Sequence, residues 1–154
     1  MNFKTFLFAG SMIILTYFSA GAQDIHGSSD HVYFKRIPGF SIRQYIVEEI
    51  GSQPFFDENN HKVIIEGKKT YLYYECDCEE SPLKIIRNFS NDIRKLGGKS
   101  LEYSDNKVYM KLNLEGLGIW AEVVAGEYYY YLTIVEKSDD KQASSPGAFQ
   151  EDLN

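Results

Sequence analysis

The sequence lacks the short motifs by which common enzyme classes are recognised. It contains no G-x-S-x-G nucleophile elbow, no P-loop, no dinucleotide-binding fingerprint and no H-E-x-x-H metal motif. Positive charge is also scarce, because 16 lysines and arginines stand against 22 aspartates and glutamates, and the basic residues form no patch. This balance argues against nucleic acid or an anionic membrane surface as a partner. We therefore predict a protein that is not an enzyme and that needs neither a cofactor nor a metal ion.

No apolar run is long enough to span a bilayer as a helix, which takes roughly 20 residues. The longest run, from Phe6 to Phe18, follows the basic residue Lys4 and precedes the small residues Ser19 to Ala22. This order is typical of a secretory signal peptide, so we predict one over residues 1–22 and a mature chain that begins at Gln23. A retained membrane anchor is the alternative. We expect an exported protein with no transmembrane segment after cleavage.

The rest of the chain divides into a domain and a tail. Residues 23–137 have the length of one folded domain with a modest core. Residues 138–154 are polar and acidic and contain Gly, Pro and Ser, so we predict a disordered tail. Residues 24–30 are rich in Gly, Ser and Asp and predict an irregular start to the domain. Pro38 and Gly39 predict a turn.

One helix is expected, beginning after Ser81. Ser81 and Pro82 are the residue types favoured at the N-cap and the first helical position. Gly97 is the type favoured at a left-handed C-cap. Between them, apolar residues recur every three or four positions and predict one buried stripe. The stripe comprises Leu83, Ile86, Phe89 or Ser90, Ile93 and Leu96.

Two strands are expected before the helix. Residues 40–50 predict a strand, with a short helix from Ser41 as the alternative. The composition of residues 51–61 predicts a loop, in which Phe55 and Phe56 could tuck under the sheet. Residues 62–76 predict one long strand that bends at Gly67, in preference to a hairpin.

Four strands are expected after the helix, because apolar and polar residues alternate between short turns. Their approximate ranges are 100–103, 107–114, 119–123 and 128–135. Short turns between alternating strands predict an antiparallel meander. The expected fold class is therefore α+β, with one amphipathic helix packed on a mainly antiparallel sheet of about five or six strands.

Several residues resemble the landmarks of a known family. Residues 24–31, followed by Arg36-Ile37-Pro38-Gly39 and Tyr45, resemble the opening of a domain of unknown function. Residues 66–68 and the helix from Ser81-Pro82-Leu83 through Asn88-Phe89 to Leu96-Gly97 match its later landmarks. That domain occurs in exported proteins of Gram-negative bacteria, often ahead of an OmpA-like peptidoglycan-binding domain. The resemblance covers roughly residues 24–136.

The resemblance implies a place in the cell envelope, in the periplasm or at the periphery of the outer membrane of a Gram-negative bacterium. It also implies a non-enzymatic accessory role, and it carries over no catalytic residue. We separately expect an envelope protein or a glycan as the partner. We expect a standalone form of the domain, because no OmpA-like part follows residue 136 in this sequence.

The two cysteines, Cys76 and Cys78, stand where the long strand passes into the helix. On an extended strand their Cα atoms would be about 6.5–7 Å apart, near the upper limit for a disulfide, so a bridge requires a local turn. Three interpretations stay open: a structural pair or two free thiols, a redox-active disulfide, and a soft-metal site. A metal site needs two further ligands, and no histidine spacing points towards the cysteines.

Tyrosine and tryptophan are concentrated on the predicted strands. The candidate ligand-binding residues are Tyr71, Tyr73, Tyr109, Trp120, Tyr129 and Tyr131. A sheet face lined by such side chains suits sugar or peptide recognition, because each ring offers a large contact area and a polar tip. The alternative is a half-buried sheet in which aromatic residues simply reflect strand propensity.

A polar cluster near the predicted mature N-terminus comprises Asp24, His26, Asp30 and His31. It could hold a cation or orient an acid–base histidine; the alternative is a network of caps and turns. Two functional hypotheses result. The first is an exported envelope accessory or binding module, whose contact surface is the sheet face that the helix leaves uncovered. The second is a thiol-redox or metal-binding envelope protein that uses Cys76 and Cys78.

Overall fold

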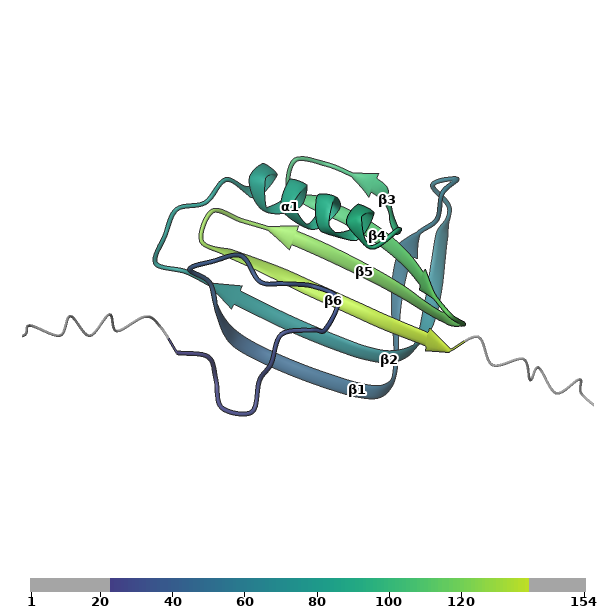
Figure 1. The fold of residues 1–154 in the computed structure, drawn as a ribbon, viewed down its shortest axis with the longest axis horizontal. Helices are drawn as coiled ribbons and strands as arrows, with labels where there is room; N and C mark the ends of the chain where they lie inside the picture. The colour runs from purple at the N-terminus through teal and green to yellow at the C-terminus, as the bar shows by residue number, and fades with distance from the viewer. Residues whose placement is uncertain (1–22, 139–154) are drawn as a thin grey trace, which may run out of the picture.

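The computed structural model describes residues 23–138 and shows one helix and a six-stranded antiparallel sheet, so the predicted α+β class is confirmed (Figure 1). In chain order the elements are β1 (Ser41–Phe56), β2 (Lys62–Glu75), α1 (Pro82–Lys95), β3 (Lys99–Tyr103), β4 (Lys107–Leu114), β5 (Leu117–Ala125) and β6 (Tyr129–Ser138). The predicted signal peptide, and the predicted tail from residue 139 onwards, lie outside the described residues.

The spatial order of the strands is β1-β2-β6-β5-β4-β3, and every neighbouring pair is antiparallel. β3 to β6 form the predicted meander, whose last strand, β6, then pairs with β2. Since β2 and β3 lie far apart in this order, the chain between them crosses the sheet. Helix α1 occupies that crossing and packs over β3, β4 and β5 (Figure 1).

The ends of α1 lie where the sequence predicts them. Gly97 has a φ of 84°, and the last turn is closed by two backbone bonds, from Gly97 N to Arg94 O and from Gly98 N to Ile93 O. This is the Schellman arrangement. Ser81 has the extended N-cap conformation, but its side chain forms no capping hydrogen bond. Its backbone N–H instead donates to the Glu80 carboxylate over 3.0 Å.

The buried stripe of α1 differs from the predicted one at its ends. The buried residues are Ile85, Ile86, Phe89, Ser90 and Ile93. Leu96 is 44% exposed, because it is the C-cap residue and its φ and ψ of −82° and 0° no longer continue the helical spacing. Leu83, in the first turn, is only half-buried, and Ile85 takes part in the core in its place.

The prediction of a loop over residues 51–61 is wrong for most of its length, since β1 continues to Phe56 and pairs with β2 down to Lys62. Gly51 and Pro54 suggest a break, but β1 is an edge strand, and an edge strand tolerates a proline. Phe55 is fully buried, as the predicted tucking under the sheet requires. The preference for one long bent β2 over a hairpin is confirmed.

The distal part of the β1–β2 hairpin leaves the plane of the sheet at Gly67. The last β2 residue paired with β6 is Lys68, whereas pairing with β1 continues for the rest of β2. Beyond this point the hairpin rises steeply across the face opposite α1 (Figure 1). There the ring of Phe55 lies 5.7 Å from that of Trp120 and 6.0 Å from that of Tyr109.

The helix-side face of the sheet has two covers, which together enclose the main core. α1 covers one half, and the N-terminal segment (residues 23–40) lies across β6 and β2 in the other half (Figure 1). Phe40 packs on Tyr130 at 4.9 Å between ring centroids, and the Tyr74 hydroxyl donates to Asp30 over 2.9 Å. The opposite face is covered only where the hairpin folds over it, and elsewhere it is open.

Candidate functional site

Four tyrosines gather on the open part of the sheet, and we call them the tyrosine face: Tyr71, Tyr73, Tyr129 and Tyr131. Tyr131 stacks with Tyr73 at 4.9 Å between ring centroids and with Tyr71 at 6.0 Å. Tyr129 completes the group, with its ring 5.3 Å from Tyr131 and 6.1 Å from Tyr73. The four rings form one continuous aromatic surface.

Strand register explains why these side chains meet. β2 and β6 are neighbours, and Tyr73 pairs directly with Tyr131 across them. Because side chains alternate along a strand, Tyr71 and Tyr129 share that face, whereas Tyr74 and Tyr130 point into the main core. The tyrosine face therefore sits on two central strands whose other side is packed against the core, which holds its geometry firmly.

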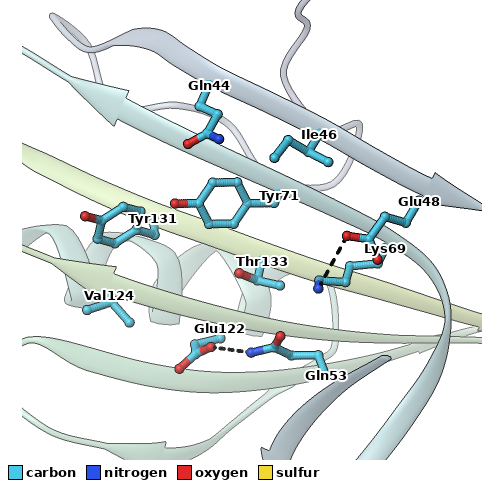
Figure 2. A pocket seen from close by; sticks show the side chains of 10 residues that line it. All are labelled: Gln44, Ile46, Glu48, Gln53, Lys69, Tyr71, Glu122, Val124, Tyr131 and Thr133. Carbon is cyan, nitrogen blue, oxygen red and sulfur yellow. Dashed lines mark hydrogen bonds and ion pairs between the residues drawn. The ribbon is translucent and has the colours of Figure 1, made fainter. Parts of the chain in front are cut away.

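The tyrosine face borders a hollow of about 620 Å³ on the open side of the sheet (Figure 2). Tyr71, Tyr131 and Thr133 contribute from β2 and β6, and β1 contributes Ile46 and Glu48 on one side. Gln53, from the folded-back part of the hairpin, lies at the other side next to Glu122 (Figure 2). The hairpin thus turns a sheet face into a trough.

The polar groups of the trough are tied to one another. Glu48 pairs with Lys69 at 3.7 Å. Glu122 pairs with Lys107 at 2.7 Å and also accepts a hydrogen bond of 3.0 Å from the Gln53 amide. Such pairing holds the carboxylates in place while leaving some acceptor capacity for a ligand.

The phenol groups of Tyr71 and Tyr73 stay protonated at neutral pH. Burial raises the pKa of Tyr71 above its ordinary value. Burial also raises the pKa of Tyr73, and the hydrogen bond that its hydroxyl donates to Glu75 raises it further. The Tyr71 hydroxyl can therefore both donate and accept a hydrogen bond, whereas the Tyr73 hydroxyl already donates to Glu75 and can only accept one from a ligand.

Tyr109 and Trp120, the other two aromatic candidates, share this side of the sheet but are not on the open surface. They are 6% and 8% exposed, because the folded-back hairpin packs Phe55 onto both rings and forms a second, smaller core. The six predicted residues therefore separate into four that line an accessible surface and two that are covered. The only indication of this difference in the sequence was the prediction that Phe55 packs under the sheet.

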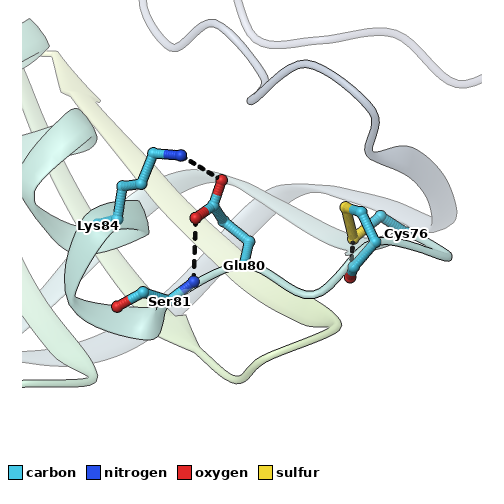
Figure 3. The surroundings of a disulfide bond; sticks show 5 residues. Cys76, Glu80, Ser81 and Lys84 are labelled. Carbon is cyan, nitrogen blue, oxygen red and sulfur yellow. Dashed lines mark hydrogen bonds and ion pairs between the residues drawn. A yellow bond between two sulfur atoms is a disulfide. The ribbon is translucent and has the colours of Figure 1, made fainter.

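Cys76 and Cys78 form a disulfide, with their Cα atoms 5.1 Å apart, so the chain makes the local turn that a bridge requires. Cys76 is buried at the edge of the main core and Cys78 is exposed. The corner is fastened to the β5–β6 turn by backbone bonds from Cys76 to Tyr128 and from Glu80 to Glu127. Figure 3 shows this corner leading into α1, where Glu80 also pairs with Lys84.

The polar cluster near the N-terminus is organised around Arg36, which sequence reasoning did not place there. Its guanidinium forms a two-pronged pair with Asp24, at 2.7 Å for each bond, and pairs with Asp30 at 2.8 Å. Asp24 also accepts a 2.8 Å bond from the backbone of Ile42. Asp24 and Asp30 are thus held mainly in an ion-pair network centred on Arg36, which differs from the network of caps and turns that was the alternative to a cation site.

His31 lies apart from that network, with its Nε2 atom 3.7 Å from Glu136. Burial lowers the pKa of His31 and the Glu136 carboxylate opposes that shift. His26 is exposed in a turn.

Searches for known relatives and for recognisable site types found little. No protein-family model matches the chain, and no curated protein matches it. Within residues 23–138, no group of three or more His, Cys, Asp or Glu side chains is placed to hold a metal ion. No helix in this same range combines the length and apolar character needed to cross a bilayer.

Proposed function

We propose that the protein is a non-catalytic binding module of the bacterial cell envelope and that the trough along the tyrosine face is its contact surface. The observation that carries this proposal is the stacked array of Tyr71, Tyr73, Tyr129 and Tyr131 beside an open hollow of about 620 Å³. Burying aromatic rings stabilises a folded chain. Four neighbouring rings that stay partly accessible on central strands therefore indicate a surface that binds a partner.

The chemistry of the trough suits a glycan or a peptide from the envelope. Tyrosine rings bury a large area with little loss of side-chain freedom, and their hydroxyls bond to a polar ligand. Glu48, Glu122 and Gln53 add acceptors and a donor for hydroxyl or amide groups at the rim. The rigid floor limits the entropy that binding would cost.

The envelope location rests on two features of the sequence: the signal-peptide pattern of residues 1–22 and the resemblance to an exported domain that often precedes OmpA-like domains. The proposed compartment is the periplasm or the periphery of the outer membrane of a Gram-negative bacterium. A disulfide persists in such an oxidising compartment, so the Cys76–Cys78 bridge is compatible with it.

The absence of catalysis is part of the proposal. Both carboxylates of the trough sit in ion pairs, Glu48 with Lys69 and Glu122 with Lys107. Among the residues that the structure describes, the lining of the trough contains no histidine, cysteine or serine that could act with these carboxylates as a base or a nucleophile.

Isothermal titration with purified muropeptides and with envelope glycans tests the proposal. We expect saturable binding that weakens at least tenfold in Tyr71→Ala and in Tyr131→Ala, because each change removes a stacked ring. Tyr128→Ala is the matched control, since Tyr128 is an exposed tyrosine of the β5–β6 turn outside the trough. If no muropeptide, glycan or envelope extract binds, the proposal is wrong.

The thiol-redox alternative has one observation in its favour: Cys78 is an exposed residue, and thiol–disulfide exchange requires that a thiolate can reach the bridge. Against it, Glu75, Asp77, Glu79 and Glu80 surround the pair in sequence and disfavour a thiolate. Thiol alkylation followed by mass spectrometry of protein isolated from cells distinguishes a structural disulfide from a redox-active one. A uniformly closed bridge indicates a structural corner, and mixed oxidation states indicate redox use.

A further inference from the structure

The outer surface of α1 carries two arginines that have no acidic partner. The nearby lysines are all paired: Lys84 with Glu80, Lys95 with Asp92 and Lys99 with Glu58, at 2.7, 2.8 and 3.1 Å. Arg87 and Arg94, by contrast, form no ion pair with any side chain that the structure describes. In a chain with a net charge of −6, two uncompensated guanidinium groups on one helix stand out.

These arginines flank a hollow of about 450 Å³ between α1 and β3, lined by Arg87, Ser90, Asn91, Arg94 and Ser100. Arg94 follows Arg87 by seven positions, which places the two arginines on the same side of the helix about 10 Å apart along its axis. Arginine side chains are long enough to reach a common group from both ends of that gap. None of the five lining residues is acidic.

Two serine hydroxyls at this hollow lack partners. Ser90 Oγ and Ser100 Oγ are both buried, and neither forms a hydrogen bond within the described part of the chain. Ser90 is only 2% exposed, and it comes from α1 whereas Ser100 comes from β3. Buried hydroxyls are nearly always satisfied, so two orphans that line one hollow indicate a missing acceptor.

The amide of Asn91 adds a further donor. Arg94 donates to the Asn91 Oδ1 atom over 3.4 Å, which uses the acceptor of that amide and leaves its NH₂ group for another partner. The hollow therefore offers two guanidinium groups and one amide as donors, and two unpartnered hydroxyls are buried in its walls.

We propose that the hollow between α1 and β3 binds a phosphate group. A phosphate presents several acceptor oxygens in a tetrahedral array and so matches donors that converge from a helix and a strand. A carboxylate has two oxygens, which a single arginine fork already satisfies. The phosphate belongs either to a soluble phosphorylated compound or to a lipid headgroup.

The test is an NMR titration of the ¹⁵N-labelled protein with glycerol 3-phosphate, with sodium acetate at equal ionic strength as the reference anion. We expect saturable shifts at Arg87, Asn91, Arg94 and Ser100 for the phosphate, and at least tenfold weaker saturation for acetate. Arg87→Gln and Arg94→Gln should each weaken phosphate binding at least tenfold. Lys84→Gln is the matched control, because Lys84 is a cation of the same helix outside the hollow, and it should leave binding unchanged.

Co-sedimentation with vesicles identifies the source of the phosphate. Binding to vesicles that contain phosphatidic acid but not to pure phosphatidylcholine, lost in Arg87→Gln, assigns a lipid headgroup. Binding of glycerol 3-phosphate without vesicle binding assigns a soluble compound. The proposal is overturned if shifts do not saturate, if acetate binds equally well, or if Lys84→Gln weakens binding as much as the arginine variants do. The site is remote from the tyrosine face, so Tyr71→Ala should not alter this titration.

Discussion

At Gly67, β2 lies so close to the backbone of β6 that no side chain fits between them. A Cβ atom there would lie 2.2 Å from the carbonyl oxygen and 2.9 Å from the carbonyl carbon of Glu136, and the backbone cannot yield as a flexible side chain would. Gly118 offers a contrast on the neighbouring β5, where an added Cβ would come no closer than 3.6 Å to Lys137 O.

We therefore expect Gly67→Ala to lower the free energy of unfolding by about 2–4 kcal/mol, since overpacking against backbone forces the strands apart. Gly118→Ala should change it by less than about 1 kcal/mol. Urea denaturation of both variants measures the difference. Equal effects of the two substitutions would show that the close approach at Gly67 does not constrain the fold.

The Asp24–Arg36 pair predicts a pH dependence of stability. The hydrogen-bonded Arg36 guanidinium holds the pKa of Asp24 below its ordinary value. A depressed pKa in the folded state means that the pair stabilises the fold above the unfolded pKa of about 4, and that this contribution is lost as the pH falls further.

We expect Asp24→Asn to destabilise the protein by about 1–2 kcal/mol at pH 7, allowing for partial exposure of the pair. The difference from the parent protein should shrink as the pH falls below 4. Denaturation series at pH 7 and pH 3 measure it, with Asp105→Asn in the exposed β3–β4 turn as the control. A difference that persists unchanged at pH 3 would refute the ion-pair explanation.

At the scale of the element, the buried residues of α1 differ from those that the sequence periodicity predicts. The spacing in the sequence puts Leu96 in the stripe and omits Ile85, whereas the structure buries Ile85 completely and leaves Leu96 at the C-cap. The three-and-four spacing of apolar residues does not show where a helix ends. Here α1 ends at Lys95, so Leu96 lies one residue beyond the helix and does not join its buried stripe.

We expect Ile85→Ala to cost about 2–5 kcal/mol, because it opens a cavity in the main core. Leu96→Ala should cost less than about 1 kcal/mol, because that side chain is half in solvent already. Thermal or chemical denaturation of the two variants measures which substitution lowers the free energy of unfolding more. The reverse order would support the stripe that the sequence alone predicts.

At the scale of the whole molecule, the folded-back hairpin joins the first strand of the chain to the meander at its end. Phe55 bridges this distance by packing on Tyr109 and Trp120. Trp120 is the single tryptophan of the protein, so its fluorescence reports directly on this contact.

We expect Phe55→Ala to cost about 3–5 kcal/mol and to make Trp120 accessible to acrylamide, because the hairpin then loses its anchor. Ile50→Ala is the control on the same strand, since Ile50 is 91% exposed and should leave both stability and quenching unchanged. Unaltered quenching in Phe55→Ala would mean that the hairpin is held by other contacts.

Local features of the chain were predictable because they depend on neighbours in sequence. Three such features are the positions at which α1 begins and ends, the alternation of Leu72 and Tyr74 with Tyr71 and Tyr73, and the turns of the meander. These patterns also identified the face of the sheet on which the four tyrosines lie. The sequence by itself thus determined the helix, the fold class and the composition of each strand face, but it did not predict the second half of β1.

Tertiary structure decided which parts of those faces meet solvent. Tyr109 and Trp120 have the same strand pattern as Tyr71 and Tyr73, yet only the first two are covered, because a hairpin from far away in sequence bends over them at Gly67. The pairing of Arg36 with Asp24 and Asp30 and the hollow between α1 and β3 likewise depend on how separate segments pack. Local patterns indicate which side of an element faces the core, whereas long-range contacts decide which parts of the other side are also covered.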